Sequence, residues 1–520
     1  MLLQKYPGDL AITLSKVLRY GALIEYRGPK TLIHSRNLVS VEQGADTMVH
    51  KLRIDLSLGR VSPSTGNAPF ISSPLGFVPK GDGGLRRIHH LSFPRKASVN
   101  HYIDEASSTL VYTSLYKVTN HVIAAGKHCI IMKRDIKDAF RNIPVAYQDR
   151  WLLGFCWKDV FYTENCLPFG LATAPFIFNL FAEGFHWMLE SFLGWDASEH
   201  FLDDFIRVIT QRGTLEVSKI VADYIVLTDI LGIPRNDSKD MIGTKVTVLG
   251  IEIDTDEFVI RLPKEKLQQA IIRTATALSR ATTTLFDIQS LTGFLSFCAQ
   301  AVQLGWVFMR HLWNFVASFP GESAFQKRRI PARVRQDLLW WNELLPTFNG
   351  VKFFDNSTRP ETQLFTDASG VGLGGYYSRE GVTPSHKCTF ATALRLPLPS
   401  SRVFDINPHE MDAILFAFQK WGQQWAKHVV VVNTDSQTAE RGLWKQTLRS
   451  GPTNAPLRDI LVIAARLDIV IKPHWIQGVS NRLADALSRF DNHTVANSFP
   501  QWRAPYSNLA QDHQQHGGKK

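Results

Sequence analysis

The stretch His200–Ile209, HFLDDFIRVI, places two adjacent carboxylates, Asp203 and Asp204, inside a run of apolar and β-branched residues. Such a run predicts two short strands that meet at a tight turn, with the acids at its tip. Aspartate is also common in surface hairpins, so this stretch alone leaves an ordinary turn open. However, the turn lacks the glycine usual in two-residue hairpin loops, and the adjacent charges repel each other. A divalent cation would offset that repulsion, so we expect a partner carboxylate elsewhere.

A matching acid ends another predicted strand, in HCIIMKRDIKDAFRNIPV. The apolar segment Cys129–Met132 predicts a buried strand that leads to Asp135, and the aromatic Phe140 follows five residues later. Strand ends open onto crevices while the strand holds the side chain in place. If Asp135 and the Asp203 hairpin occupy adjacent strands of one sheet, their carboxylates converge on the same ions. Two Mg²⁺ ions about 3.5–4 Å apart would activate an attacking hydroxyl and orient a triphosphate.

Two further motifs lie near these acids in the chain. The segment NCLPFGLATAPFIFNLF predicts a turn around Gly170 that opens a helix whose start contacts a base pair or a phosphate. The segment SSPLGFVPKGDGGLRRIHHLS predicts a hairpin whose cations, Lys80, Arg86 and Arg87, clamp phosphate charge. An ordinary turn before a core helix and a solvated basic loop are the structural alternatives for these two segments.

A second set of acids lies in the last third of the chain, each at the end of a predicted element. Asp367 ends a strand in LFTDASGVGLGGYY, Glu410 begins a helix in INPHEMDAILFAFQKW, Asp435 ends a strand in VVVVNTDSQ, and Asp485 lies near a helix start in GVSNRLADALSR. Each has a structural alternative; Glu410, for example, fits a helix-capping glutamate. Together, four acids in the order strand, helix, strand, helix indicate another two-metal site.

The bulk composition limits the class of protein. The 520 residues predict several domains, and 44% hydrophobic with 20% charged residues exclude a wholly disordered chain. An excess of 58 Lys and Arg over 47 Asp and Glu favours a polyanionic partner. Five scattered cysteines favour a reducing compartment, and no signal peptide or run of about 18 apolar residues occurs, so we expect an intracellular protein of the cytoplasm or nucleus that is not secreted and has no membrane partner.

In this order, the basic hairpin, the acid five residues before an aromatic, LPFG and FLDD resemble the reverse transcriptases of retroelements. LGIPRNDSK and VLGIEID continue the resemblance, which covers residues 70 to 255. It implies that Asp135, Asp203 and Asp204 are catalytic and bind metal, with Asp204 the least direct ligand. Phe140 would exclude a 2′-hydroxyl from the nucleotide sugar. The remaining substrate-binding residues implied are Lys80 and Arg86 for the triphosphate, Phe169 and Gly170 for the nucleotide and template pocket, and Lys239.

TDAS, Glu410 on a helix, TDS and ADALSR resemble ribonuclease H over residues 360 to 490. The resemblance implies hydrolysis of the RNA strand of an RNA–DNA hybrid. It also implies that four catalytic acids hold the metal: Asp367, Glu410, Asp435 and Asp485. One feature departs from the family, because WIQGVSNRLAD lacks the mobile histidine that many members carry before the last acid. His474, on the preceding predicted strand, is given no role.

The resemblances imply a multidomain α+β and α/β protein: a right-hand polymerase with fingers, palm and thumb, then a helical connection and a ribonuclease H-like mixed sheet. The expected boundaries are 1–125 for the N-terminal region and fingers, 126–255 for the palm, 256–350 for the thumb and connection, 351–360 for a linker, 361–490 for the ribonuclease H-like domain and 491–520 for a polar tail. GALIEYRGP, RIHHLSFPRKASVN and LTGFLSFCAQAVQLGWVFMRHLW resemble the DIRS-like retrotransposons, which pair this polymerase with a tyrosine recombinase.

The expected function is therefore RNA-directed DNA polymerisation with ribonuclease H cleavage, using two Mg²⁺ ions per centre, with Mn²⁺ as an alternative. Expected partners are an RNA template, a DNA primer, RNA–DNA hybrid, deoxynucleoside triphosphates and an element-encoded recombinase or capsid-like protein. An inactive or domesticated relic that only binds nucleic acid is the main alternative, and intact acids in both sets argue against it. A pararetroviral or long-terminal-repeat polymerase shares the motifs. We expect the chain to be one product of a larger element or a fragment.

Overall fold

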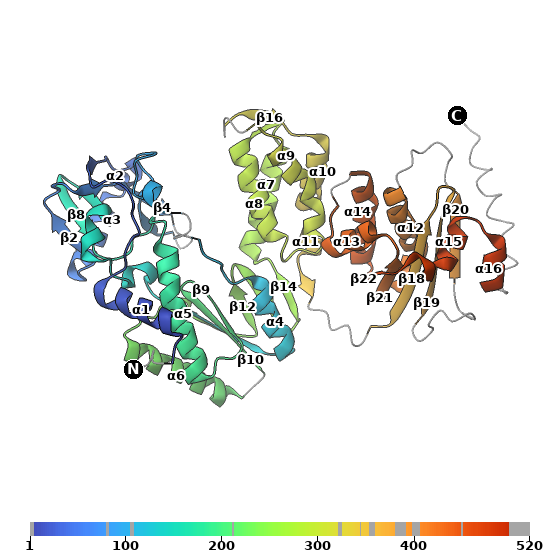
Figure 1. The fold of residues 1–520 in the computed structure, drawn as a ribbon, viewed down its shortest axis with the longest axis horizontal. Coiled ribbons are helices and arrows are strands. Elements are labelled where there is room, and N and C mark those ends of the chain that lie inside the picture. The colour runs from blue at the N-terminus through green and yellow to red at the C-terminus, as the bar shows by residue number, and fades with distance from the viewer. Residues whose placement is uncertain are drawn as a thin grey trace. The chain divides into compact units, whose positions relative to one another are not determined.

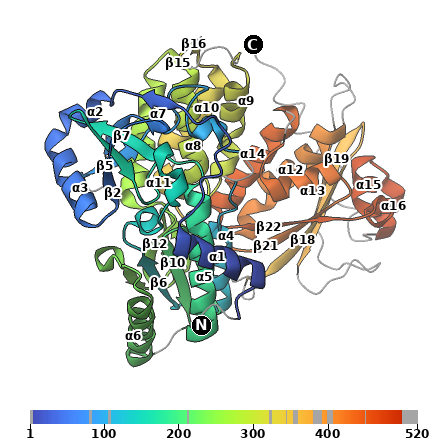
Figure 2. The same ribbon diagram turned by 60° about the vertical axis from the view of Figure 1, so that its left-hand side comes forward.

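The computed structural model describes residues 5–79, 83–104, 109–210, 213–320, 325–343, 345–352, 359–379, 392–397, 406–448 and 451–498. The chain divides into two compact units, residues 1–258 and 259–520, and both contain helices and sheets (Figures 1 and 2). Within the described part of the chain, no helix combines the length and the apolar character that crossing a membrane requires.

The central sheet of the first unit is antiparallel, with strand order β11-β6-β10-β9. Its strands are β6 (Ile130–Asp135), β9 (Ser198–Phe201), β10 (Asp204–Ile209) and β11 (Met241–Gly243). The expected strand before Asp135 is β6, and the expected hairpin at HFLDDFIRVI is β9–β10. In the register of the sheet, Asp204 lies directly opposite Asp135. The adjacency that the acid pattern required is therefore present.

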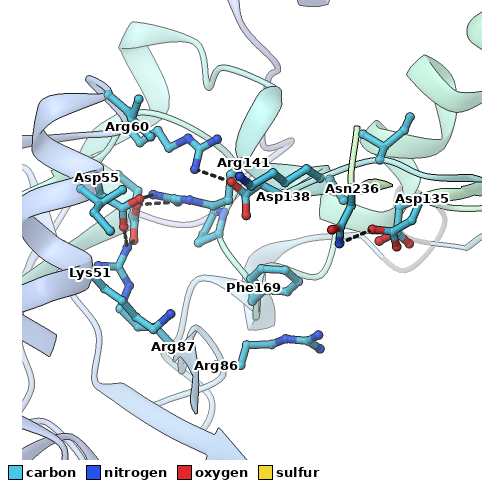
Figure 3. A pocket seen from close by; sticks show the side chains of 18 of the residues that line it. Lys51, Asp55, Arg60, Arg86, Arg87, Asp135, Asp138, Arg141, Phe169 and Asn236 are labelled. Atoms are coloured by element: carbon cyan, nitrogen blue, oxygen red, sulfur yellow. Dashed lines mark hydrogen bonds and ion pairs between the residues drawn. The ribbon is translucent and has the colours of Figure 1, made fainter. Parts of the chain in front are cut away.

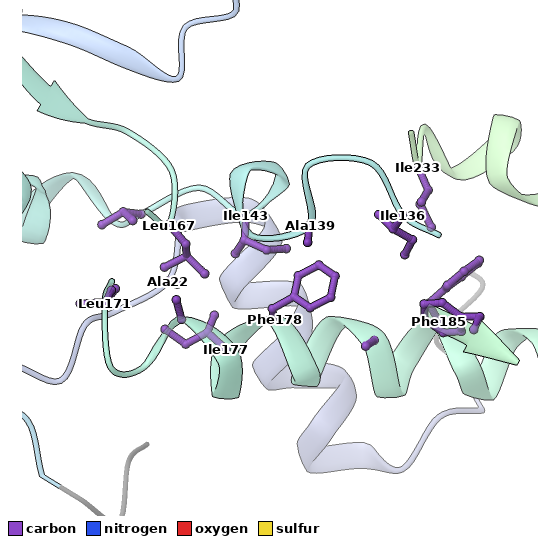
Figure 4. Close-up of a cluster of buried hydrophobic side chains, with 14 of the residues drawn as sticks. Ala22, Ile136, Ala139, Ile143, Leu167, Leu171, Ile177, Phe178, Phe185 and Ile233 are labelled. Atoms are coloured by element: carbon purple, nitrogen blue, oxygen red, sulfur yellow. The ribbon is translucent and has the colours of Figure 1, made fainter. Parts of the chain in front are cut away.

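The helices α4 (Leu115–Ala125), α5 (Ala174–Leu193) and α6 (Thr214–Leu231) pack around this sheet. Apolar residues recur along α5 at helical spacing, which makes one of its faces part of the main core of the unit. In Figure 4, Phe178 and Phe185 of α5 point toward Ala139 and Ile136 of the segment that follows β6. The core thus holds in place the chain on both sides of Asp135.

The N-terminal part of the first unit contains more helix than the sequence led us to expect. Beside its short strands and turns, the region assigned to the fingers contains α1 (Gly8–Tyr20), α2 (Val39–Gln43) and α3 (Ala45–Ser57), none of which was predicted from the sequence. The buried Leu14 of α1, and Met48 and Leu52 of α3, lie at helical spacing, a signal that short segments carry weakly.

A five-stranded sheet of order β1-β3-β7-β8-β2 packs beside α3. Its strands are β1 (Leu32–His34), β2 (Val61–Ser64), β3 (Phe70–Ser72), β7 (Gly154–Trp157) and β8 (Val160–Glu164). The basic segment forms a separate hairpin, β4 (Leu75–Pro79) with β5 (Leu85–His89), as predicted. VLGIEID forms the antiparallel pair β12 (Lys245–Val248) and β13 (Ile251–Asp254).

The second unit begins with a helical region. It comprises α7 (Lys264–Leu278), α8 (Leu285–Cys298), α9 (Arg310–Ala317), α10 (Ala332–Glu343) and α11 (Leu345–Phe348). The expected helical thumb and connection is interrupted after α8, where Leu304 has a positive φ of 69° and a 3₁₀ turn, Gly305–Phe308, follows. A side chain at Gly305 would meet the Cα of Ala299 at 2.6 Å, so close backbone packing shapes this break.

The remainder of the second unit is a five-stranded mixed sheet of order β20-β19-β18-β21-β22. Its strands are β18 (Glu361–Ala368), β19 (Gly372–Arg379), β20 (Thr392–Pro397), β21 (Val429–Thr434) and β22 (Val470–Trp475), of which β18, β21 and β22 are mutually parallel neighbours. The helices are α12 (Ile406–Trp421), α13 (Gln437–Lys445), α14 (Gly451–Arg466), α15 (Arg482–Ser488) and α16 (Asn492–Ser498).

Two expected boundaries differ from these elements. The segment predicted as a polar tail from residue 491 starts with α16, because Val495 is buried against α15 and adds to the domain core. The predicted linker starts with the short strand β17 (Val351–Lys352), which pairs with β14 (Val259–Arg261). The remainder of the linker falls mainly on residues outside the described set.

Candidate active sites

The first site is built on the turn between β9 and β10. Leu202 adopts a left-handed backbone, φ 53°, which lets the chain reverse without glycine. Asp203 therefore lies at the tip and Asp204 begins β10 beside Asp135. The backbone N–H of Ile136 donates to the carbonyl of Asp203 over 3.0 Å, which ties the tip to the end of β6. The structure thus brings the three predicted acids together at one end of the sheet.

Asp135 is buried, 5% exposed, and its carboxylate contacts the side chains of Asn236 and Lys239. The amide of Asn236 donates to Oδ1 over 2.8 Å, and Lys239 Nζ lies 3.4 Å from Oδ2. Behind it, Arg134 forms a buried ion pair with Asp240, whose Oδ1 accepts from the backbone N–H of Asp135 over 3.1 Å. These contacts fix the position of Asp135 and leave Lys239, 61% exposed, free to swing toward an anion.

The other two acids differ in their surroundings. Burial, followed by the charges of Asp204 and Asp135, raises the pKa of Asp203 to about 6. Burial also raises the pKa of Asp204, but Lys133 lies 2.9 Å from its Oδ2 and opposes the rise. Asp203 is therefore the acid of this group whose charge is least compensated by the protein.

These acids lie at one end of a cavity of about 800 Å³. Asp135, Asp203 and Lys239 line that end, whereas Lys51, Arg60 and Arg86 line the remainder with other polar residues. Figure 3 shows Asp135 and Asn236 on one side and the arginine-rich wall on the other. Asp204 is not among the described lining residues, and its carboxylate pairs with Lys133. The cavity therefore has an acidic end, and its remaining wall carries arginines and lysines together with Asp55, Asp138 and Glu164, which pair with several of the arginines.

The residues predicted for the nucleotide pocket have different positions relative to the cavity. Phe169 lines the cavity, and the Phe140 ring packs against it with ring centroids 5.2 Å apart. Gly170 has φ 117°, and a Cβ there would lie 2.0 Å from the carbonyl oxygen of His89. The glycine is thus required by the contact between this turn and β5, which also includes a hydrogen bond from His89 N to the Phe169 carbonyl.

The basic hairpin contributes its cations unequally. Arg86 lies over the Phe169 ring, 5.0 Å from its centroid, and reaches the cavity. Arg87 also lines the cavity, but it forms buried ion pairs of 2.8 Å with both Asp55 and Glu164, which compensate its charge. Lys80 lies outside the described residues.

The second site brings together three of the four acids predicted for it. Asp367 near the end of β18, Glu410 on α12 and Asp435 just after β21 each offer an oxygen within 4.8 Å of the others. Asp367 and Glu410 are buried, 5% and 6% exposed. Within the described residues, no other group of three acids, histidines or cysteines reaches this proximity, including the acids of the first site.

Electrostatics at this second cluster indicate a place for a cation. Burial, followed by the charges of Asp367 and Asp435, raises the pKa of Glu410 to about 9. Burial also raises the pKa of Asp367 to about 6, although Ser488 Oγ donates to its Oδ2 over 2.6 Å. Glu410 Oε2 is buried and makes no hydrogen bond with any of the described residues. An acceptor without a donor beside two other carboxylates fits a divalent cation that prefers oxygen ligands, such as Mg²⁺ or Mn²⁺.

Asp485 lies apart from this triad. It is on α15, its side chain is 42% exposed, and Arg489 donates to its Oδ1 over 2.6 Å. It still contributes negative charge, because it raises the pKa of both Asp367 and Asp435. His474, which received no role from the sequence, bonds Asn433 over 2.8 Å and lies on β22. Ser488 was missed because its contact with Asp367 joins positions 121 residues apart.

Residues 78–253 match the family model described as reverse transcriptase (RNA-dependent DNA polymerase). The chain therefore contains a reverse transcriptase domain. Asp135, Asp203 and Asp204 all fall inside this reverse transcriptase domain, as does the β4–β5 hairpin from Val78 onward. No curated protein matches the chain.

Solved structures to which this chain is similar include two of the foamy viral protease-reverse transcriptase. The one in complex with double-stranded DNA is 14% identical, with 91% of this chain and 79% of that chain covered and a TM-score of 0.48. The one in complex with an RNA/DNA hybrid is also 14% identical, with 90% of this chain and 61% of that chain covered and a TM-score of 0.48.

Proposed function

We propose that this chain is an RNA-directed DNA polymerase of a retrotransposon that also cleaves the RNA of RNA–DNA hybrids. The observation that carries the polymerase is the reverse transcriptase domain, whose acids meet at one end of a cavity with arginines and lysines on its remaining wall. Its substrates would be an RNA template, a DNA primer and deoxynucleoside triphosphates. The motifs outside the palm favour a DIRS-like element, with a recombinase or capsid-like protein as further partners.

In this proposal the residues divide the work by position. Asp135 and Asp203 would hold Mg²⁺, with Asp204 adding charge from behind, and the metal would activate the primer hydroxyl and neutralise the triphosphate. Lys239 would move from Asp135 to a phosphate oxygen, and Arg86 would bind the triphosphate from the opposite wall with Lys80. Phe140, supported by Phe169, would exclude a 2′-hydroxyl.

We assign the ribonuclease H activity to residues 361–498. Asp367, Glu410 and Asp435 would hold the metal, with Asp485 as an outer acid, because they form the tightest carboxylate group described. The metal would activate a water molecule for attack on the RNA phosphate. The remaining assignments follow the order of the chain: fingers to residue 125, palm with the remaining part of the fingers to 255, and helical thumb and connection to 350.

Primer extension tests the polymerase. Purified protein with a DNA primer on an RNA template, deoxynucleotides and Mg²⁺ is expected to extend the primer. Asp203→Asn is expected to lower the rate at least about 100-fold, since a lost metal ligand removes charge stabilisation at the reacting phosphate. Asp223→Asn, an exposed acid on α6, is the matched control. Binding of the hybrid without extension would favour a relic that only binds nucleic acid.

Cleavage of a labelled RNA–DNA hybrid tests the second activity. Glu410→Gln is expected to abolish cleavage while extension continues, because Glu410 belongs to the triad of the second unit. Glu265→Gln, an exposed glutamate on α7, is the matched control. Cleavage at the wild-type rate by Glu410→Gln would remove the ribonuclease H assignment and leave the polymerase assignment intact.

A further inference from the structure

The turn that carries Phe140 has an uncommon backbone. Asp138 and Ala139, the two residues before Phe140, have φ values of 61° and 22°, and neither is glycine. The 3₁₀ turn η3 (Ala139–Asn142) follows at once, with Arg141 N donating to the Asp138 carbonyl over 2.7 Å. Left-handed residues without glycine persist only where surrounding contacts hold them, and such segments gather at functional sites.

One contact holds this turn from the Asp138 side. Arg60 Nη1 lies 2.9 Å from Asp138 Oδ2, and the arginine side chain is only 17% exposed (Figure 3). The backbone of Arg60 is fixed in turn: its N–H donates to the Asp55 carbonyl, and its own carbonyl accepts from Asn165, both over 2.8 Å. Arg60 is therefore a rigid anchor and not a flexible surface cation.

A second contact holds the turn from the Arg141 side. Arg141 pairs with Glu164 over 2.6 Å and with Asp55 over 3.4 Å, and all three are largely buried. Arg87 completes the group by pairing with both acids. Asp55 therefore contacts both arginines: its carboxylate pairs with Arg141, and its backbone carbonyl accepts from the N–H of Arg60.

Phe140 lies between these two anchors, and its ring rests against Phe169 and Phe178, with centroids 5.2 and 5.6 Å away. The neighbouring chain positions on both sides of the ring, Asp138 and Arg141, are held by ion pairs, so the position of its backbone depends on those pairs as well as on the ring contacts. Exclusion of a single hydroxyl by an aromatic ring depends on its placement within a fraction of an ångström.

We propose that the Arg60–Asp138 ion pair positions Phe140 and thereby sets the discrimination between deoxyribonucleotides and ribonucleotides. This inference rests on the proposed polymerase function. Arg60 acts through Phe140 and is a positioning residue: it holds the strained turn, the turn holds the ring, and the ring meets C2′ of the incoming sugar. When the pair is broken, the turn relaxes and the ring withdraws, so ribonucleotides gain access.

The test is single-nucleotide incorporation with each deoxynucleotide and its ribonucleotide, compared as the ratio of their kcat/KM values. Arg60→Gln and Asp138→Asn are each expected to lower this ratio about tenfold, mainly through a higher kcat/KM for the ribonucleotide. The double variant is expected to match either single variant, because one interaction is lost in all three. The exchange Arg60→Asp with Asp138→Arg is expected to recover part of the discrimination.

Two further variants separate the explanations. Phe140→Ala is expected to lower the ratio in the wild-type background, which shows that the ring is the gate. Arg27→Gln breaks an exposed ion pair with Asp104 in the same unit and is the matched control, expected to keep the wild-type ratio.

The outcomes distinguish a failure of this inference from a failure of the proposed polymerase function. If wild-type protein incorporates neither nucleotide, the polymerase function and this inference fail together. If Phe140→Ala lowers the ratio while Arg60→Gln raises KM equally for both nucleotides, the gate stands and Arg60 is only a phosphate contact or a structural residue. A lowered ratio in both Arg60→Gln and Asp138→Asn, with no further loss in the double variant, supports the positioning role.

Discussion

At the level of single residues, the two sites treat their acids differently. Asp135 is held by Asn236 and by backbone contacts, whereas Glu410 Oε2 has no donor among the described residues and Asp203 faces two other carboxylates. Burial and like charge therefore store unfavourable energy at Asp203 and Glu410. In the proposed function a cation would relieve that energy, so activity and stability would oppose each other at the same side chains.

Asp203→Asn is therefore expected to stabilise the metal-free protein. The pKa of Asp203 is raised from 3.8 to about 6 in the folded protein, so its ionised form is more favourable in the unfolded chain. The free energy of unfolding therefore falls as the pH rises from 3.8 through about 6. At pH 7.5 in EDTA, the variant should gain about 1–2 kcal/mol in denaturant unfolding. Mg²⁺ should then stabilise the wild type more than the variant. Lower stability of Asp203→Asn in EDTA would refute the repulsion, and Asp223→Asn should change stability by less than about 0.5 kcal/mol.

At the level of elements, Gly170 and Gly194 both have a positive φ, but only at Gly170 would a side chain also clash with its surroundings. Gly170→Ala is expected to destabilise the first unit by about 3 kcal/mol or more, because the new Cβ would lie 2.0 Å from the His89 carbonyl oxygen at a positive φ. Gly194→Ala, after α5, also has a positive φ of 63° but meets no atom within 4 Å. Its cost should stay near 1 kcal/mol. Equal costs in urea unfolding would show that backbone strain alone matters at Gly170.

A buried histidine pair joins α5 to β9 and predicts a dependence of stability on pH. His186 and His200 face each other with their Nδ1 atoms 2.9 Å apart, and burial lowers the pKa of each to about 4. Because the folded pKa lies below the unfolded value of about 6.5, the contribution is complete above pH 6.5. It falls as the pH drops toward 4, by up to about 1.4 kcal/mol per pH unit for each histidine.

Urea unfolding at a series of pH values checks this prediction. His186→Asn is expected to give a shallower loss of stability between pH 6.5 and 4.5 than the wild type, because one buried group no longer has to become protonated. His50→Asn, an exposed histidine on α3, is the matched control and should keep the wild-type slope. A wild-type slope in His186→Asn would show that other groups govern the acid sensitivity.

At the level of the molecule, each unit is held together by contacts between distant segments. In the second unit, Asp337 of α10 is fully buried and accepts from Arg458 of α14 over 2.7 Å and from His311 of α9 over 3.0 Å. This joins the helical region to the domain that carries Asp367. Both contacts depend on the single carboxylate of Asp337, which lies between the donors Arg458 and His311.

Asp337→Ala is expected to destabilise the second unit by about 3–5 kcal/mol, because it leaves a buried guanidinium without its partner. Thermal unfolding should show the loss in the transition of the second unit, and tryptophan fluorescence would follow it through Trp340 and Trp341 of α10. Asp287→Ala removes an exposed ion pair with Arg280 and should cost under about 1 kcal/mol. Similar losses in the two variants would mean that the buried network contributes no more than a surface pair.

The sequence predicted the elements that place the acids more fully than it predicted their surroundings. The strand before Asp135, the hairpin at Asp203 and the helix of Glu410 are all present, because apolar period and turn residues act over a few positions. It did not predict α1 to α3 or the break after α8. Short helices carry little periodic signal, and that break depends on close packing of Gly305 against Ala299.

The motif order in the chain was sufficient to identify a reverse transcriptase domain and to name the acids, since each acid follows its own local element. Which acids lie close together, which pair with lysine and which arginines are engaged in ion pairs depended on contacts across long separations in sequence. Asp204 against Lys133, Arg87 against Glu164 and Ser488 against Asp367 are such contacts. They arise only when the sheets and helices have packed, because no local pattern records which distant side chain will lie within 3 Å.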